Sequence, residues 1–202
     1  MALSQCFDSI YYYERDPKAF ADRYDSVAFE DVHPHVLTYL PSSGSVLDVG
    51  AGSGRDARFM AARGLKVTAV EPSAGLRDLG ARNSKGVIWI DDRLPDLERI
   101  VEKTERFDLI LCSAVLMLVE PMDLKKSLTT FAQVLVPAGK LAINLRTPMP
   151  DEPPGIFFDH TDHDVLAAAD AAGFRCLHRF EAKDALGRSG YDWRGFVFER
   201  SN

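Results

Sequence analysis

Short apolar runs alternate with helix-length segments from residue 45 to residue 146, and this alternation limits the chain to few folds. The apolar runs are SVLDVG (45–50), LKVTAVE (65–71), GVIWID (86–91), FDLILCS (107–113) and GKLAINLR (139–146), and helices are expected over 54–63, 73–83, 95–103 and 121–136. Strands that are joined through helices run parallel, and the helices then cover both faces of the sheet. The alternation therefore predicts a doubly wound, mostly parallel α/β sheet.

The last third of the chain has a different pattern. A helix capped by Thr161 or Asp162 is expected to end near Ala172, before Gly173. Two strand-like runs follow, FRCLHRFEA and YDWRGFVFER, and only the turn-rich segment KDALGRSG separates them. Without a helix between them, these runs should form an antiparallel pair. A chain of 202 residues accommodates this seven-stranded sheet in a single domain.

The first forty residues are expected to be helical and to precede a core that spans 41–202. A helix can begin at Asp16, with Pro17 at its first position. A second helix is expected over 26–40, with Pro34 as a point of interruption.

Composition excludes several classes of protein. The net charge of −6 disfavours a large nucleic-acid or membrane surface, which needs clustered Lys and Arg. The three cysteines, Cys6, Cys112 and Cys176, have no spacing typical of disulfides or zinc, and no metal site is expected around His160 and His163. The N-terminal residues lack the pattern of a secretory signal, and no apolar run is long enough to cross a membrane, so we expect a cytoplasmic protein.

The strongest motif is VLDVGAGSGRDA, in which Gly50, Gly52 and Gly54 follow a strand and precede a helix. Glycines allow a sharp turn and a close approach of backbone to a ligand, and a helix N-terminus supplies free N–H groups. A nucleotide-like cofactor is expected there, at the carboxyl ends of the strands. The dinucleotide fingerprint G-x-G-x-x-G would need glycine at the position of Arg55, so NAD is disfavoured. Asp48 suits a cationic ligand and would repel a pyrophosphate.

Two further acidic positions follow neighbouring strands. Glu71 ends the second apolar run, where a carboxylate can accept hydrogen bonds from both hydroxyls of a ribose. Asp91 and Asp92 end the third run and precede the step Leu94-Pro95. Both are candidates for a ligand contact, and the alternative is that they cap a helix.

This set of motifs resembles the class I S-adenosylmethionine-dependent methyltransferases over residues 20–200. The resemblance implies that Gly50, Ala51, Gly52 and Gly54 wrap the methionine end of S-adenosylmethionine (SAM), and that S-adenosylhomocysteine (SAH) is the product. It implies that Asp48 helps to place the cofactor, that Asp91 or Asp92 holds the adenine amino group, and that Ser113 lies at the edge of the cleft. Tyr24 matches the Tyr-Asp start of the family, where an N-terminal helix forms a lid over the cofactor; residues 1–40 are expected to be this lid.

Within the superfamily, the chain is similar to small bacterial tellurite-resistance methyltransferases. The similarity rests on GRDARFMAARGLKVTAVEPS, on LILCSAVLML and on Leu177-His178-Arg179. It implies that His178, Arg179 and Arg188 line the substrate side, and His178 is also the weak candidate for a catalytic base because its unperturbed pKa is near neutrality. Arg146, at the end of the fifth run, can hold an anionic substrate.

The expected function is therefore in-line transfer of the sulfonium methyl group to a small molecule, with neither nucleic acid nor membrane as partner. Two alternatives remain open: a non-catalytic binding protein of the same fold and an NAD-binding oxidoreductase. The fourth run ends with Cys112 and Ser113, and Ala114 follows, which disfavours the chemistry of base-amine methyltransferases. Cys112 is expected to be an inert buried thiol rather than a cofactor contact.

Overall fold

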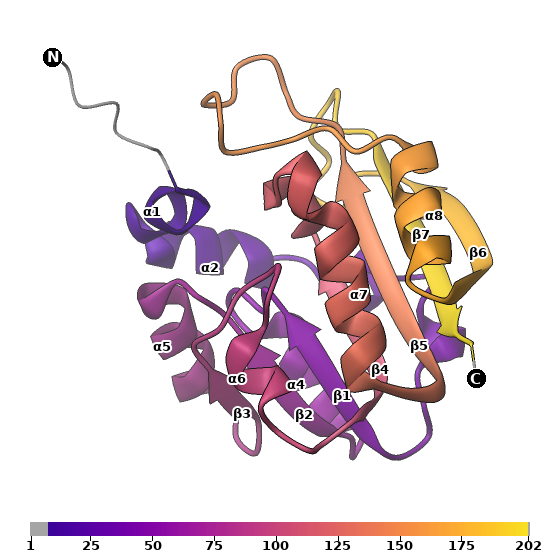
Figure 1. Ribbon diagram of the computed structural model, residues 1–202. Coiled ribbons are helices and arrows are strands. Elements are labelled where there is room, and N and C mark those ends of the chain that lie inside the picture. The colour runs from indigo at the N-terminus through magenta and orange to yellow at the C-terminus, as the bar shows by residue number, and fades with distance from the viewer. Residues whose placement is uncertain (1–7, 202) are drawn as a thin grey trace, which may run out of the picture.

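The computed structural model describes residues 8–201, which form a seven-stranded sheet between two layers of helices (Figure 1). The strands are β1 (Ser45–Val49), β2 (Lys66–Val70), β3 (Ile88–Ile90), β4 (Phe107–Ser113), β5 (Leu135–Arg146), β6 (Phe174–Ala182) and β7 (Trp193–Arg200). The helices are α1 (Ser9–Glu14), α2 (Pro17–Asp25), α3 (Phe29–Val32), α4 (Arg55–Ala62), α5 (Ala74–Asn83), α6 (Glu98–Val101), α7 (Leu124–Val134) and α8 (Asp162–Ala171).

The strand order β3-β2-β1-β4-β5-β7-β6 reverses direction at β1, where the chain leaves toward β2 on one side and later returns as β4 on the other. The first five strands pair in parallel, and β7 lies antiparallel between β5 and β6. The predicted doubly wound sheet and its antiparallel C-terminal pair are confirmed. In such a sheet, ligands bind at the carboxyl ends of the strands on either side of the reversal.

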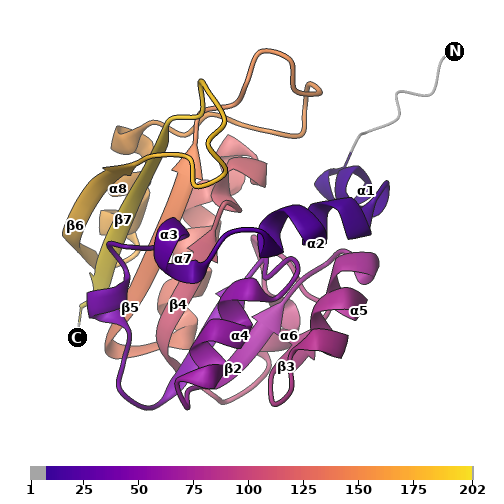
Figure 2. The same cartoon turned by 180° about the vertical axis from the view of Figure 1, so that it is seen from behind.

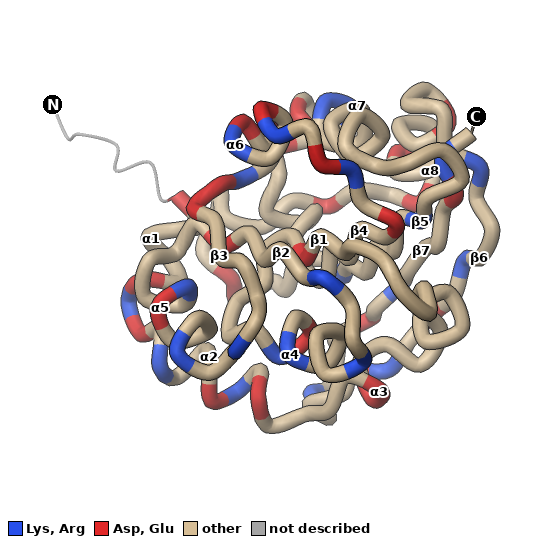
Figure 3. Tube along the Cα trace, turned by 90° about the horizontal axis from the view of Figure 1, so that it is seen from below, with Lys and Arg blue, Asp and Glu red and all other residues tan. Residues whose placement is uncertain are grey.

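Helices α6, α7 and α8 cover one face of the sheet, and α3, α4 and α5 cover the other (Figures 2 and 3). Two apolar clusters fill these layers. One joins the sheet to α7 and α8 through residues such as Leu128, Phe131 and Val165, and the other joins it to α3 and α4 through Phe29 and Met60. The central strands β1 and β4 are buried on both faces, which explains why apolar residues dominate their sequences, with Asp48 in β1 and Asp108 in β4 as the charged exceptions.

The N-terminal residues are helical only in part. Asp16 caps α2 and Pro17 is its first residue, as predicted, because the Asp16 side chain accepts a hydrogen bond from the N–H of Ala19. The predicted helix over 26–40 forms only in part, as α3 and a single 3₁₀ turn at Leu37–Tyr39. The interruption expected at Pro34 is confirmed, since proline lacks the N–H that a continuous helix needs.

Among the helices between residues 8 and 201, none has both the length and the apolar character needed to span a membrane.

Candidate functional site

A cavity of about 1160 Å³ opens at the carboxyl ends of β1, β2, β4 and β5. Its walls include the loop that follows β1, the residues directly after β2 and β4, and the end of β5. Side chains of α1 and α2, of the segment 152–158 and of the β6–β7 connection complete it. Small-molecule sites usually measure roughly 300–1,000 Å³, so this cavity is large enough for a cofactor together with a second small molecule.

The glycine loop connects β1 to α4 and turns through left-handed backbone. Gly50, Gly52 and Gly54 have φ of +70°, +54° and +79°, a region that side chains disfavour. A Cβ on Gly50 would lie 2.3 Å from Val115 Cγ2, so a larger residue cannot fit. Gly50, Ala51 and Gly52 line the cavity. Gly54 lies behind the loop instead, where a Cβ would collide with the Trp89 ring at 2.8 Å, so it serves the packing of the turn.

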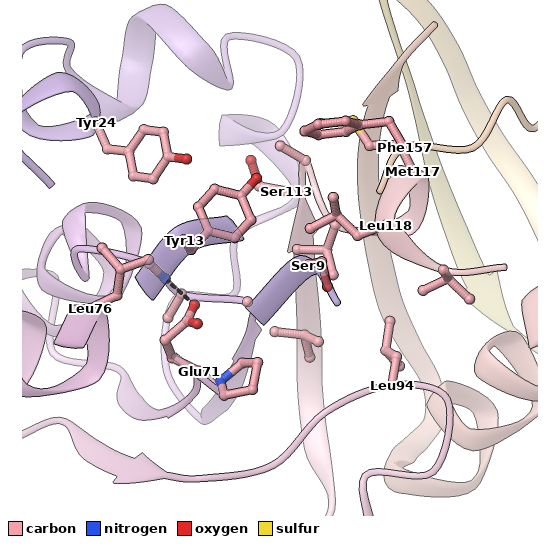
Figure 4. Close-up of a pocket in the computed structure, with 18 of the residues that line it drawn as sticks. Ser9, Tyr13, Tyr24, Glu71, Leu76, Leu94, Ser113, Met117, Leu118 and Phe157 are labelled. Atoms are coloured by element: carbon pink, nitrogen blue, oxygen red, sulfur yellow. Dashed lines mark hydrogen bonds between the residues drawn. The ribbon is translucent and has the colours of Figure 1, made fainter. Parts of the chain in front are cut away.

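Glu71 follows β2 directly and faces the cavity beside the glycine loop (Figure 4). Its Oε2 accepts a hydrogen bond from the N–H of Gly52 at 2.8 Å, and its Oε1 accepts one from the N–H of Ser73 at 2.8 Å. Burial raises the pKa of this carboxyl to about 7, although both backbone donors and Arg77 favour the ionised form. Each carboxylate oxygen has a further lone pair for a ligand hydroxyl.

Asp48 does not line the cavity, contrary to the expected direct contact with the cofactor. Its side chain is buried beneath the loop, with a residue exposure of 1%, and Oδ2 has no hydrogen-bond partner within the described part of the chain. Burial, with the nearby charge of Asp56, raises the pKa of the Asp48 carboxyl well above its usual value. Asp48 therefore belongs to the packing between β1 and α4 and not to the cavity wall.

A buried ionic cluster at the start of α4 was not predicted from the sequence. Asp56 lines the cavity and accepts hydrogen bonds from Arg55, and its Oδ2 lies 2.9 Å from Nε2 of His33. His33 and Arg55 lower the pKa of the Asp56 carboxyl, in spite of the opposing effect of its burial. The cluster ties the segment after α3 to the glycine loop. The dipeptide Arg55-Asp56 was visible in the motif, but its partner His33 is 23 residues away.

The structure separates the two acids that follow β3, and both line the cavity. Asp92 is buried, and its two carboxylate oxygens accept hydrogen bonds from the N–H groups of Arg93 at 2.9 Å and Ile100 at 3.0 Å. The Asp91 side chain is 50% exposed, with Arg77 Nη1 3.4 Å from its Oδ1. Asp92 thus holds the following loop and α6, whereas the Asp91 carboxylate is accessible to a ligand.

Aromatic side chains of the N-terminal helices cover the glycine loop. Tyr24 on α2 is 3.4 Å from the position of a Cβ on Gly52, and Tyr13 on α1 lies beside it over Glu71 (Figure 4). Burial raises the pKa of Tyr24 to about 12 and that of Tyr13 well above its usual value, so both hydroxyls are protonated at neutral pH. Ser113, at the end of β4, lines the cavity on the other side. Ser113 thus lies at the cavity, where the edge of the cleft was expected, and Tyr24 lies over Gly52.

Ala114, directly after Ser113, has a φ of +59°, which is strained for a residue with a Cβ. Its N–H lies 2.7 Å from Oδ1 and 3.0 Å from the carbonyl oxygen of Asn144 on β5. Both residues line the cavity. Strained backbone of this kind is found preferentially at ligand sites, because the surrounding structure must enforce it.

The four predicted substrate residues fall into two groups. Arg146 and Arg188 line the cavity, from the end of β5 and from the β6–β7 connection. His178 and Arg179 do not line it. His178 packs against His35 and Phe180 on β6, an edge strand, and Arg179 forms an ion pair with Asp162 at the start of α8. Their place at the edge of the sheet therefore removes His178 as a candidate base and Arg179 as a substrate contact at this cavity.

Two further residues considered from the sequence are structural. Cys112 is fully buried in the apolar core, and burial raises the pKa of its thiol, which confirms an inert core residue. His160 is 1% exposed, and its Nε2 lies 2.9 Å from the carbonyl oxygens of Leu116 and Val119. It fastens the segment after β5 to the loop after β4.

Comparisons with known proteins agree with this geometry. Residues 46–139 match a family model described as a methyltransferase domain. The chain is 33% identical over 142 residues to a protein-L-isoaspartate O-methyltransferase of Chlorobaculum parvum, which covers 66% of this chain and 64% of that protein. The chain thus spans less than two thirds of the length of this relative.

Solved structures show the same fold. A TehB-like SAM-dependent methyltransferase from Corynebacterium glutamicum superimposes with a TM-score of 0.72 at 16% identity, over 93% of this chain and 99% of that chain. The N-methyltransferase NodS from Bradyrhizobium japonicum, in complex with SAH, gives a TM-score of 0.75 at 16% identity, over 96% and 100%. At these identities the likeness establishes the fold alone, so the similarity to tellurite-resistance enzymes is a likeness of fold.

Proposed function

This chain belongs to the class I SAM-dependent methyltransferase superfamily, and we propose that it transfers the sulfonium methyl group of SAM to a small molecule and releases SAH. The observation that carries this proposal is the hydrogen bond between Gly52 N–H and Glu71. It unites the glycine loop after β1 and the carboxylate after β2 into one wall of the cavity. That wall offers close backbone approach and a charged acceptor within the same small region.

The residues present fit an adenosyl sulfonium better than a dinucleotide. Glu71 and Asp91 both line this end of the cavity. Acidic groups favour a cationic sulfonium and ammonium and oppose a pyrophosphate. In the proposal, Glu71 accepts hydrogen bonds from the ribose hydroxyls, and Asp91 accepts one from the adenine amino group.

The N-terminal helices are proposed to act as the lid over this end of the cavity, within residues 1–40. Glu14 at the end of α1 accepts hydrogen bonds from Ser73 Oγ at 2.7 Å and from the N–H of Gly75 at 2.9 Å. This contact fastens the helix to the start of α5, while Tyr13 and Tyr24 cover Gly52 and Glu71. A closed lid excludes water from the reacting groups.

The bound cofactor supplies an electrophilic methyl group for in-line displacement. The chain's own residues bind, orient and shield, and these effects provide most of the acceleration in such a reaction. Ser113, Ala114 and Asn144 line the cavity at β4 and β5, the strands next to β1 in the sheet, so the acceptor is proposed to bind beside them.

A methyl-release assay tests the proposal. Purified protein is incubated with SAM labelled in the methyl group and a panel of thiols, chalcogen oxyanions, phenols and amines, and labelled product is separated from cofactor. We expect label on at least one class, with loss of transfer in Glu71→Ala. Absence of transfer to every class, with SAM bound, would favour the non-catalytic binding protein; binding of NAD instead of SAM would favour the oxidoreductase.

A further inference from the structure

A second cluster of polar and aromatic side chains lies in the same cavity, at the end of β5, two strands from the glycine loop. Arg146 ends β5, Glu152 and Phe157 belong to the segment that follows it, and Arg188 and Tyr191 come from the β6–β7 connection. All five line the cavity. The proposed cofactor site uses none of them.

The guanidinium of Arg146 already holds a carboxylate. Its side chain is 6% exposed, Nη1 donates to Glu152 Oε2 at 2.9 Å, and Nη2 donates to Glu152 Oε1. This two-pronged geometry is the one in which a guanidinium recognises planar oxyanions. Glu152 belongs to a surface segment in which Asp151 and Pro154 are exposed, so its side chain can turn outward to water. Its Oε2 also accepts a hydrogen bond from the N–H of Met149 at 2.8 Å, and an incoming carboxylate would take over this donor together with Arg146.

Aromatic rings complete the surroundings of both guanidinium groups. The Arg146 guanidinium carbon lies 5.0 Å from the Phe157 ring centroid and 4.8 Å from that of Tyr191. The Arg188 guanidinium carbon lies 3.9 Å from the Tyr191 centroid, and Asp184 neutralises Arg188. Planar guanidinium and aromatic groups provide stacking surfaces for another flat ring.

Charge decides which acceptors fit. A buried guanidinium left without a counter-ion is strongly destabilising, so a neutral molecule cannot replace Glu152 at low cost. A carboxylate can, because one anion exchanges for another and Arg146 stays paired. Building on the proposed function, we propose that the methyl acceptor is an aromatic carboxylic acid whose carboxylate displaces Glu152 from Arg146. A second nucleophile of the same molecule, such as a phenol oxygen, gains the methyl group as the S–CH3 bond of SAM breaks, and its proton passes to solvent.

Calorimetric titration with benzoate tests this inference on protein saturated with SAH. Benzamide has the same shape without the charge, and we expect it to bind at least about tenfold more weakly than benzoate. Glu152→Gln removes the competing carboxylate and should strengthen benzoate binding by about five- to tenfold. Arg146→Lys keeps the positive charge but loses the two-pronged geometry, so this variant should bind benzoate about tenfold more weakly than the wild type.

Arg179→Lys is the matched control, because Arg179 is also paired with an acid but lies outside the cavity. This variant should bind benzoate with the same affinity as the wild-type protein. Thermal melting followed by circular dichroism shows whether each variant folds. If Arg146→Lys does not fold, the test rests on the affinity of Glu152→Gln for benzoate and on the comparison of benzoate with benzamide. Equal binding of benzoate and benzamide, or no gain in Glu152→Gln, would overturn the inference. Protein that binds SAH but not benzoate refutes this inference alone, whereas protein that does not bind SAH refutes the proposed function.

Discussion

The N–H of Gly52 donates a hydrogen bond to Glu71 Oε2 over 2.8 Å, so the turn after β1 and the residue after β2 are locked to each other at the cavity. The backbone of Gly52 and the carboxylate of Glu71 therefore cannot move independently. A ligand that contacts either one meets a preorganised surface, which lowers the entropy cost of binding.

Glu71→Gln should weaken SAH binding by about ten- to a hundredfold, because hydrogen bonds to a charged acceptor contribute about 1.5–3 kcal/mol. Titration calorimetry at pH 8 measures the effect. Glu181→Gln, on the exposed edge of β6, is the control and should bind SAH like the wild type. Equal affinities in the wild type and Glu71→Gln would remove Glu71 from the site.

Binding of SAH should also depend on pH through Glu71, whose pKa burial raises to about 7. Ribose hydroxyls bind better to the ionised carboxylate. The affinity for SAH should therefore rise by at most about tenfold per pH unit between pH 5 and about pH 7, and stay constant above that pH. Glu71→Gln should show no such rise. A profile that is the same in both proteins would assign the dependence to another group.

The same pKa predicts an opposite trend in stability without ligand. The folded protein holds the Glu71 proton more tightly than the unfolded chain, whose glutamate titrates near 4.5. The stabilisation is therefore complete below pH 4.5 and is lost as the pH rises through about 7. Urea unfolding should show the free energy of unfolding of the wild type falling relative to that of Glu71→Gln across this window. A constant difference would contradict the raised pKa.

Substitutions of Asp91 and Asp92, the two acids after β3, should have different effects on stability and on SAH binding. Asp92→Asn disturbs two hydrogen bonds from backbone N–H groups, of which that of Ile100 is buried, and should lower the free energy of unfolding by about 1–3 kcal/mol. Asp91→Asn should leave stability within about 0.5 kcal/mol and weaken SAH binding, since its side chain is half exposed. Urea unfolding and calorimetry on both variants provide the comparison. Loss of SAH affinity in Asp92→Asn alone would reverse the assignment.

Glu14→Gln should loosen the lid without unfolding the core. Glu14 is exposed and joins α1 to the start of α5 through Ser73 and Gly75. Hydrogen exchange of residues 9–25 should accelerate by about tenfold, and the exchange of β1 and β4 should stay the same. Glu30→Gln, on the exposed surface of α3, is the control. Unchanged exchange in α1 and α2 would mean that the aromatic contacts alone hold the lid.

Sequence patterns identified the elements of the sheet because each is encoded locally. Buried strands such as β1 and β4 consist mainly of apolar residues, and caps such as Asp16 and Ser73 mark the starts of helices. The segment 26–40 was predicted to be one helix because of its apolar residues. In the structure these residues pack against α4 and β6 from α3 and from the turns that follow it, and not from one face of a single helix.

The site was less accessible to prediction, since its contacts join distant segments. The glycine motif located the cavity correctly, but burial of Asp48 depends on how the loop folds over it. His33 meets Asp56 across 23 positions, and Arg146 meets Tyr191 across 45; neither spacing has a local signature. His178 matched a family pattern in sequence, yet its strand lies at the edge of the sheet.

Calorimetric titration of the wild-type protein with SAH, and separately with NAD, shows which cofactor the cavity holds. We expect one SAH bound per chain with micromolar or tighter affinity and no heat from NAD. Binding of NAD with no binding of SAH would contradict this expectation, because a wall made from Gly52 and Glu71 would then hold a dinucleotide.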